Sequence, residues 1–317
     1  MTNNRTRGWK SALSQFVLNR TLRASGRISN AMWLHLRSIA TSLTDAPVRY
    51  DPGTGELDLP ASHPLPLYQK NFPNYDRALP RIARLLRSRK DEIVIADIGA
   101  NVGDTSAALL SIPGIFVIAI EGNPKFLPFL HTNTSKFGNR VFICEKFVGS
   151  PGDAAFSLVT REGTARLVAD KNGSVDAIIS LASAVQAAGK KHLDLLKIDT
   201  DGFDINILNS SRDYIATQTD VLFFEFDPHL FYSISPDGWN VFENLSAIGY
   251  RHYVCYTNTG SFFKAFGSAD KIGVELRIAL RDRNSLAYVD IAAFKDSDVY
   301  SEFLRSESAH FAVQGAP

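Results

Sequence analysis

The chain has 317 residues, of which 45% are hydrophobic, 21% charged and 11% aromatic. This composition is typical of a globular protein with a large core, and it excludes a disordered chain, a collagen-like repeat and a disulfide-rich miniprotein. The net charge of +1 conceals an asymmetry: residues 1–90 carry 15 Lys and Arg against 5 Asp and Glu (+10), and the remaining residues carry 19 against 28 (−9). We therefore expect two differently built parts.

The first 44 residues are basic, and no acidic residue occurs before Asp45. Trp9, Leu13, Phe16 and Val17 recur at helical spacing, which predicts a helix with one apolar stripe. Packing of this stripe on the main domain is the favoured interpretation. The alternatives are contact with a membrane surface or a partner, and a transit-like leader, since such leaders are rich in Arg and poor in acids.

Residues 45–75 are rich in Pro, Gly and Asp and lack periodicity, so they predict a linker or wrapping segment. We expect a basic N-terminal extension and linker over residues 1–75 and one domain over residues 76–317. The two cysteines, Cys144 and Cys255, are far from any CxxC spacing. This argues against a zinc cluster and favours a reducing, cytoplasmic compartment.

Helix and strand patterns alternate after a helix predicted from Pro80. Short apolar strands are expected at residues 93–97, 116–121, 141–144, 193–199 and 221–226. Helices are expected at residues 105–110, 126–137, 176–189, 205–215 and 239–249. Strands that are buried on both faces and separated by helices predict a parallel sheet covered by helices, an α/β domain.

Further strands are predicted outside this alternation. Residues 156–160 and 165–168 predict a hairpin that turns at residues 162–163. Residues 250–256 predict another strand, and residues 274–280 and 287–294 predict two tail strands that pair as a hairpin.

The most informative segment follows the first of these strands and reads Asp-Ile-Gly-Ala-Asn-Val-Gly-Asp over residues 97–104. Its glycines, Gly99 and Gly103, allow unusual backbone angles and close approach of a ligand where a strand turns into a helix. Glu121 ends the second strand, where a carboxylate accepts hydrogen bonds from both hydroxyls of a ribose. These features predict a nucleotide-type site.

The charge of the segment distinguishes between two nucleotide ligands. A dinucleotide site normally has GxGxxG, and the carboxylates of Asp97 and Asp104 would repel a pyrophosphate. The same carboxylates would attract the ammonium and sulfonium groups of S-adenosylmethionine. We therefore expect an S-adenosylmethionine site formed by Asp97, Gly99, Ala100, Asn101, Gly103, Asp104, Glu121 and Asn123.

A second polar cluster follows the fourth and fifth strands. Residues 195–204 read Leu-Leu-Lys-Ile-Asp-Thr-Asp-Gly-Phe-Asp, and residues 225–229 read Glu-Phe-Asp-Pro-His. Because parallel strands bring their carboxyl ends to one edge of a sheet, we expect these groups to face the same cleft as Glu121.

Three motifs in this order resemble the FkbM family of S-adenosylmethionine-dependent methyltransferases: Asp-Ile-Gly-Ala-Asn-Val-Gly, Ile-Glu-Gly-Asn-Pro and Leu-Leu-Lys-Ile-Asp-Thr-Asp-Gly-Phe-Asp. The resemblance spans roughly residues 80–250. It implies the class I methyltransferase fold, a Rossmann-like, seven-stranded, mostly parallel sheet with helices on both faces, and O-methylation of sugar or natural-product hydroxyls. The chain departs from the family where residues 199–202 read Asp-Thr-Asp-Gly instead of Asp-Val-Glu-Gly. It also reads Ser-Leu-Ala instead of Thr-Leu-Asp at residues 180–182.

A methyltransferase must align its acceptor with the activated methyl group, exclude water and remove a proton from the hydroxyl. Asp199 is the favoured site residue, as a base, as a partner of the donor's ammonium or as a metal ligand. Lys197 would stabilise an alkoxide or form a structural ion pair with Asp201. Glu225 and His229 are alternative bases, although His229 also suits polar packing.

A divalent metal held by Asp199, Asp201 and Glu225 would suit oxygen-ligand preferences, but a continuing strand would point the two aspartates to opposite faces. A metal is therefore not favoured. The expected function is O-methylation of a hydroxyl on a saccharide or secondary metabolite. The alternatives are an N- or carboxyl-methyltransferase and a non-catalytic binding module. The expected partner is a small-molecule or glycan acceptor and no nucleic acid, and the oligomeric state stays open.

Overall fold

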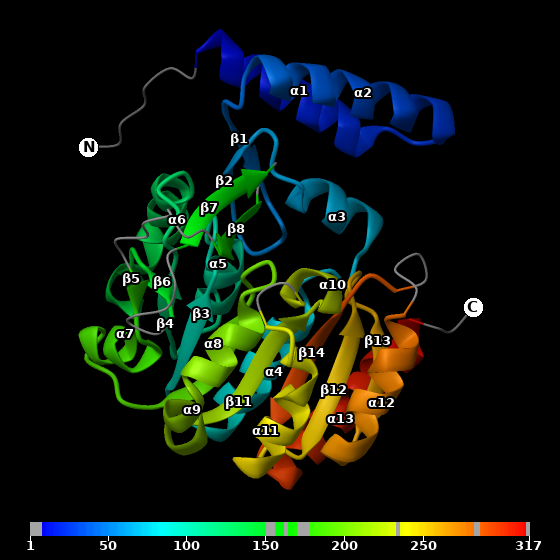
Figure 1. The fold of residues 1–317 in the computed structure, drawn as a ribbon. Coiled ribbons are helices and arrows are strands. Elements are labelled where there is room, and N and C mark those ends of the chain that lie inside the picture. The colour runs from blue at the N-terminus through cyan, green and yellow to red at the C-terminus, as the bar shows by residue number, and fades with distance from the viewer. Residues whose placement is uncertain are drawn as a thin grey trace. The chain divides into compact units, whose positions relative to one another are not determined.

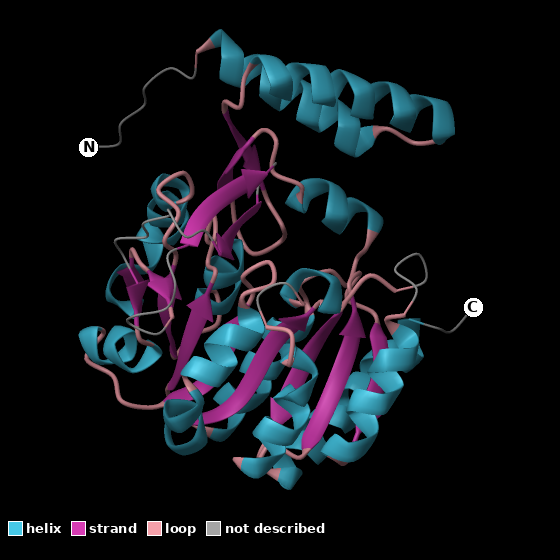
Figure 2. Ribbon diagram, viewed as in Figure 1, coloured by secondary structure: helices cyan, strands magenta, loops and turns pink. Residues whose placement is uncertain are grey.

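A computed structural model describes residues 8–149, 156–161, 164–169, 178–232, 235–281 and 286–314. Backbone contacts divide the chain into two compact units (Figures 1 and 2). The smaller unit comprises residues 1–73 with residues 160–164, and the larger unit comprises the rest. The predicted boundary at residue 75 is close to this division.

The smaller unit contains a helical hairpin, a β-hairpin and a short helix. Its elements are α1 (Trp9–Arg23), α2 (Arg27–Leu43), β1 (Pro47–Tyr50), β2 (Leu57–Pro60) and α3 (Leu65–Asn71). The antiparallel strands β1 and β2 turn Val48, Leu57 and Leu59 inward. The prediction of a linker or wrapping segment over residues 45–75 did not include these strands and helix α3, because each strand has only four residues, too few to show a period.

Helix α1 buries only part of the predicted apolar stripe. Trp9, Leu13 and Phe16 are exposed, whereas Val17 and the smaller side chains around it are buried. The hydroxyl of Thr21 donates to the carbonyl of Val17 at 2.8 Å, which keeps this polar side chain inside. Of the predicted stripe, Val17 thus packs inward as expected, whereas the expectation was wrong for Trp9, Leu13 and Phe16.

The larger unit is built on an eight-stranded sheet with the strand order β13-β12-β14-β11-β10-β3-β4-β5. Its strands are β3 (Ile93–Ile98), β4 (Ile115–Ile120), β5 (Val141–Cys144), β10 (Leu193–Ile198), β11 (Thr219–Phe226), β12 (His252–Thr257), β13 (Phe262–Phe266) and β14 (Val289–Phe294). Strands β5, β4, β3, β10 and β11 pair in parallel. Strand β14 runs antiparallel between β11 and β12. The predicted Rossmann-like, mostly parallel sheet is confirmed, with eight strands instead of seven.

Helices cover both faces of this sheet (Figure 2). One face packs against α7 (Leu181–Ala187), α8 (Asp204–Ser210), α9 (Arg212–Gln218), α11 (Val241–Ala247) and α12 (Ala269–Ala279). The other packs against α4 (Ala78–Arg89), α5 (Asp104–Leu110), α6 (Leu127–Thr134) and α13 (Ser297–Gln314). The remaining short helices are η1 (Ser135–Arg140), α10 (Pro228–Phe231) and η2 (Gly238–Asn240). This arrangement explains why the central strands are apolar on both faces.

Two predictions for the tail were wrong. Residues 274–280 belong mostly to helix α12, in which Ile272 and Leu276 face the core while Val274 and Ile278 are exposed. The exposed Val274 and Ile278, together with the buried Leu276, place an apolar side chain at every second position, which is the period of a strand. Strand β14 forms no hairpin with this segment, because it is inserted between β11 and β12.

Smaller differences concern the middle of the chain. The helix predicted at residues 205–215 is divided at Ser211 into α8 and α9. Strands β7 (Phe156–Arg161) and β8 (Thr164–Ala169) form a two-stranded sheet at the predicted hairpin, whose turn lies outside the described residues. Strands β6 (Phe147–Val148) and β9 (Ile178–Ile179) pair in parallel. Of the helices in the described ranges, none combines the length and the apolar character needed to cross a membrane.

Candidate active site

The turn after β3 is held against the end of β10. Gly99 has φ +76°, and a Cβ atom there would lie 1.9 Å from the carbonyl oxygen of Asp199. The backbone N–H of Asp199 donates to the carbonyl of Ile98 at 3.1 Å. Only glycine fits at position 99, because both its backbone angle and the space beside Asp199 exclude a side chain. The motif glycine therefore brings the two strand ends together.

Glu121 is fixed beside this turn by the backbone. Its carboxylate accepts hydrogen bonds from the N–H groups of Asn101 at 2.8 Å and Asn123 at 2.7 Å. The side chain is buried, and burial raises the pKa of Glu121 although the two backbone N–H groups oppose this shift. Each carboxylate oxygen retains a further lone pair, so the group remains able to accept from a ribose diol.

A cavity of about 540 Å³ opens at this point. It is lined by Ile98, Gly99, Asn101, Ile120, Glu121, Gly122, Phe126, Lys146, Phe147, Val148, Asp199, Thr200, Asp201, Phe203 and Ile207. Its phenylalanine rings, the carboxylate of Glu121 and two further aspartates fit S-adenosylmethionine, which has a flat aromatic base, a ribose and a cationic end.

The predicted cofactor residues divide into two groups. Gly99, Asn101 and Glu121 line the first cavity. The other five are not among the residues that line it: Asp97, Ala100, Gly103, Asp104 and Asn123. Gly103 serves helix packing instead, since a Cβ atom there would lie 2.7 Å from Leu130.

Asp97 and Lys197 form a buried ion pair between neighbouring strands. They are directly opposite each other in the register of β3 and β10, with Nζ 2.9 Å from Oδ1 of Asp97. The same Nζ is 3.4 Å from Oδ2 of Asp199, and it donates to the carbonyl of Gly99 at 3.3 Å. Ser106 donates its hydroxyl to Asp97 at 2.6 Å.

This pair changes two predictions. Burial alone would lower the pKa of Lys197, but Asp97 and Asp199 outweigh burial and raise it, so the amine stays charged. The ion pairs of Lys197 run to Asp97 and Asp199 instead of the partner considered from the sequence, Asp201. Asp97 is thus paired with Lys197. From the sequence, it was expected to contact the ammonium group of S-adenosylmethionine.

The loop after β10 turns back on itself. Asp201 has φ +51° and Gly202 has φ +102°. Asp204 accepts hydrogen bonds from the N–H of Gly202 and from both the N–H and the hydroxyl of Thr200. Burial, together with neighbouring Asp199, raises the pKa of Asp204 to about 7. Because of this turn, Asp199 and Asp201 both line the first cavity.

A second cavity of about 470 Å³ is lined by Asn74, Asp76, Ala78, Leu79, Thr105, Lys197, Ile198, Asp199, Phe223, Glu225, Tyr256, Gly260 and Asp290. Glu225 and Asp290 are opposite each other in the register of β11 and β14, an unfavourable position for two like charges. In the described part of the chain, Oε1 of Glu225 is buried and has no hydrogen-bond partner. Such a carboxylate pair at a cavity wall indicates a binding role.

Sequence reasoning missed Asp76 and Asp290. Asp290 is the single charge among residues 288–294, otherwise a buried apolar strand, and this was the signal available. Asp76 follows no strand, and its φ of +57° could not be read from the sequence.

The second cavity includes three of the four predicted catalytic residues. Lys197, Asp199 and Glu225 line it, and Asp199 lines the first cavity as well. His229 lies elsewhere, in an open hollow with Tyr232, Trp239 and Arg277 among its lining residues. The guanidinium of Arg277 is 4.3 Å from the centre of the Trp239 ring. The structure therefore does not group His229 with the other candidate bases.

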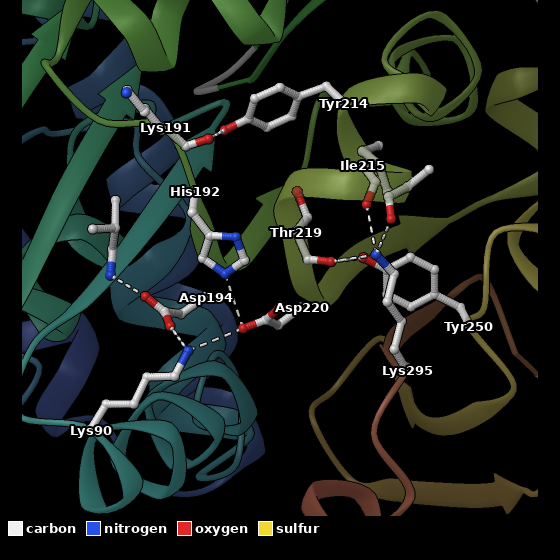
Figure 3. A network of polar contacts seen from close by, with 12 residues as sticks. Lys90, Lys191, His192, Asp194, Tyr214, Ile215, Thr219, Asp220, Tyr250 and Lys295 are labelled. Atoms are coloured by element: carbon white, nitrogen blue, oxygen red, sulfur yellow. Dashed lines mark hydrogen bonds and ion pairs between the residues drawn. The ribbon is translucent and has the colours of Figure 1, made fainter.

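Another polar network lies at the opposite ends of β10 and β11 (Figure 3). Among the described residues, one group of three side chains of the kinds that bind metals lies close enough together to hold an ion. It consists of His192, Asp194 and Asp220. Lys90 already bridges the two aspartates, and His192 contacts Asp220 at 3.0 Å. Asp194 also accepts from the N–H of Val94 at 2.7 Å. This network joins strand starts, and its residues line neither of the two cavities described above.

Comparison with known proteins adds to this geometry. Residues 97–252, which include every residue that lines the first cavity and six of the thirteen that line the second, match the methyltransferase FkbM domain. The chain carries an FkbM methyltransferase domain. The FkbM domain is a domain of S-adenosylmethionine-dependent methyltransferases, and the glycine turn, Glu121 and Lys197 all lie within the match. No curated protein matches the sequence.

The solved structures to which this chain is similar differ from it strongly in sequence. Precorrin-6y C5,15-methyltransferase from Geobacter metallireducens is 16% identical, with a TM-score of 0.35, over 68% of this chain and 86% of that one. Fibrillarin pre-rRNA processing protein from Methanococcus jannaschii is 11% identical, with a TM-score of 0.36, over 65% and 67%. A TehB-like S-adenosylmethionine-dependent methyltransferase from Corynebacterium glutamicum is 10% identical, with a TM-score of 0.37, over 68% and 88%.

Replacement of Glu121 tests the cofactor side of the site. We expect Glu121→Ala to weaken S-adenosylmethionine binding by roughly 100-fold, because two charge-assisted hydrogen bonds to a ribose would be lost. Isothermal titration calorimetry measures the affinity. Glu145→Ala is the matched control, since Glu145 also directly follows a strand but its side chain is 55% exposed. Equal affinities of a folded Glu121→Ala variant and the wild type would contradict the assignment.

The carboxyl groups of the site predict a pH dependence of stability. Burial, followed by the neighbouring Asp199 and Asp204, raises the pKa of Glu225 well above its ordinary value. The folded protein then holds more protons than the unfolded chain, so the free energy of unfolding falls as the pH rises. For Asp204 this window extends from 3.8 to about 7.

Glu225→Gln removes one of these titrating groups. We expect its free energy of unfolding to fall less steeply than that of the wild type as the pH rises above the ordinary pKa of glutamate. Urea denaturation at several pH values measures the slope. Glu243→Gln on the exposed side of α11 is the control and should retain the wild-type slope. An identical slope in Glu225→Gln would show that this carboxyl does not titrate as argued.

Proposed function

We propose that the chain transfers the methyl group of S-adenosylmethionine to a hydroxyl group of a saccharide or secondary metabolite. The observation that carries this proposal is the position of Asp199, which lines both cavities. With the methyl donor in the first cavity and the acceptor in the second, the two would meet beside this carboxylate. The donor supplies a methyl group that is already activated on a sulfonium.

The residues of the chain would bind, orient and deprotonate. Glu121 would hold the ribose, and the carboxylates of Asp199 and Asp201 would attract the cationic end of the donor. Lys197 keeps its charge and orients Asp199 through their 3.4 Å contact. Asp199 would then accept the hydroxyl proton as the methyl group is transferred.

The lining of the second cavity supports a polyhydroxylated acceptor. Asp76, Glu225 and Asp290 provide hydrogen-bond acceptors on several sides, as the hydroxyl groups of a sugar require. The carboxylate of Asp199, which lines the same cavity, would repel a carboxylate acceptor, which argues against carboxyl methylation. It would also attract a protonated amine, so N-methylation is the second candidate.

A labelling experiment distinguishes these candidates. The protein is incubated with S-adenosylmethionine carrying a radiolabelled methyl group and an extract of the source organism, and the labelled product is isolated. A methyl ether survives mild base and carries no added cation, a methyl ester releases labelled methanol, and an N-methyl product binds a cation exchanger. Ether label supports the proposal, and either other product overturns it. Absence of both label and calorimetric binding would instead indicate a non-catalytic module.

We also propose a cytoplasmic location for this reaction. Cys144 and Cys255 are both buried and unpaired, as is usual for proteins of a reducing compartment. Labelling of cell fractions with an antibody against the chain would test this location.

A further inference from the structure

Helix α2 presents a continuous row of large apolar side chains to solvent. The row follows the helical period and consists of Ile28, Met32, Leu36, Ile39 and Leu43. Its two ends are the most exposed, at 88% for Ile28 and 74% for Leu43, so the row extends over the whole helix. An amphipathic helix normally turns such a row toward a core, and an exposed one indicates a surface that something else covers.

Helix α1 adds three exposed apolar side chains to this surface. Trp9, Leu13 and Phe16 lie on one face of α1, and the ring of Phe16 meets that of Trp33 in α2 edge to face at 6.1 Å. The two helices therefore contribute to one module. Together, these exposed side chains of α1 and α2 are here named the hairpin face.

The exposure of the hairpin face does not come from poor folding of the hairpin. Lys70 donates to the carbonyls of Thr21 and Ala24, each at 2.8 Å, and so fixes the turn between the helices. Arg37 donates to the carbonyls of Ala61 and His63, each at 2.8 Å, and so anchors α2 from its other side. Polar contacts thus hold one side of the hairpin while the apolar side stays outward.

The charge around the hairpin face has a single sign. Residues 8–44 contain no acidic residue, and Lys10, Arg20, Arg23 and Arg27 are exposed. The Arg20 guanidinium is 5.3 Å from the centre of the Phe16 ring, and the Lys10 amine is 5.9 Å from that of Trp9. Cations beside exposed aromatic rings are typical of helices that lie in a membrane interface.

We propose that the hairpin face binds the surface of a membrane containing anionic lipids. Anionic headgroups would neutralise the exposed cations while the apolar row enters the acyl boundary. A second copy of the chain suits this face less well, because it would bring cations toward cations with no acid between them. Since neither helix is apolar and long enough to span a bilayer, both would lie in the plane of the surface.

Vesicle sedimentation of the full chain tests the proposal. Vesicles of phosphatidylcholine alone are compared with vesicles containing about one-third phosphatidylglycerol, at salt concentrations from about 0.1 M to about 0.5 M. We expect strong binding to the anionic vesicles, weak binding to the neutral ones and loss of affinity as salt rises. Failure of the wild type to sediment with anionic vesicles would overturn the proposal.

Variants locate the binding to the hairpin face. The triple variant Ile28→Ser, Met32→Ser, Ile39→Ser should bind anionic vesicles at least roughly tenfold more weakly, because three inserted side chains are lost. Arg23→Gln with Arg27→Gln should bind more weakly only at low salt. Leu34→Ser is the control, since Leu34 is exposed on the same helix but lies outside the row. Vesicle binding by the triple variant equal to that of the wild type overturns the proposal.

Two further measurements accompany these variants. Unchanged thermal unfolding and unchanged S-adenosylmethionine affinity show that the triple variant is folded, because all three side chains are exposed. Light scattering reports the oligomeric state of the wild type in solution. A wild-type dimer that becomes a monomer in the triple variant would assign the hairpin face to a second copy and overturn the membrane assignment.

Discussion

Gly99→Ala is expected to abolish measurable S-adenosylmethionine binding and to destabilise the fold by several kcal/mol. A methyl group at this position would lie 1.9 Å from the carbonyl oxygen of Asp199, which is backbone and cannot rotate away. The substitution also places a side chain at φ +76°, which by itself costs about 1–2 kcal/mol. Urea denaturation and calorimetry measure the two effects.

Gly189→Ala separates the two causes. Gly189 has φ +69°, close to the angle of Gly99, but a Cβ atom there would meet nothing within 4 Å. Gly189→Ala should therefore lose only the stability that the unfavourable backbone angle costs. It should bind S-adenosylmethionine with wild-type affinity. Similar losses of stability in the two variants would mean that the turn after β3 is not crowded by β10.

Asp199→Asn is expected to lower the rate of methyl transfer by roughly 100-fold or more while the protein stays folded. The amide has nearly the shape of the carboxylate but cannot accept a proton. Because Asp201 and Glu121 remain in the first cavity, affinity for S-adenosylmethionine should fall by no more than about tenfold. Single-turnover labelling of an extract at saturating S-adenosylmethionine measures the rate.

Asp201→Asn is the matched control for this variant. Asp201 is two residues further along the same loop and lines the first cavity but not the second. Its replacement should therefore affect affinity more than rate. A wild-type rate in Asp199→Asn would remove Asp199 from proton transfer and make Glu225, which lines the same second cavity, the next base to test.

The sheet edge that carries the first cavity was predictable from the sequence, although only three of the eight predicted cofactor residues line that cavity. Strands β3, β4, β10 and β11 are apolar on both faces, and their ends carry glycine or acidic residues, so their common edge follows from the pattern. Gly99 and Glu121 could be assigned in this way because their roles depend on local geometry. The ion pair of Lys197 with Asp97 could not, because it depends on which strands are neighbours in the sheet.

The acceptor side depends on long-range placement and was predicted less well. Asp290 reaches the second cavity because β14 is inserted beside β11, and nothing near residue 290 in the sequence specifies that neighbour. His229 follows the end of β11 as expected, but the chain turns into α10 and places it in a different hollow. The prediction of a strand in place of α12 was wrong for a related reason. The spacing of apolar residues does not reveal which of them the rest of the protein covers.

The position of β14 has a consequence for synthesis on the ribosome. This strand lies between β11 and β12, yet it is made after both of them, so the sheet of the nascent chain stays open at that place until residue 294 has emerged. Strands β3, β4, β10 and β11 are complete about 70 residues earlier. Truncation before residue 289 would thus leave a chain that retains these strands but lacks Asp290, which lines the second cavity. It would also leave an unpaired edge on β11 that is prone to aggregation.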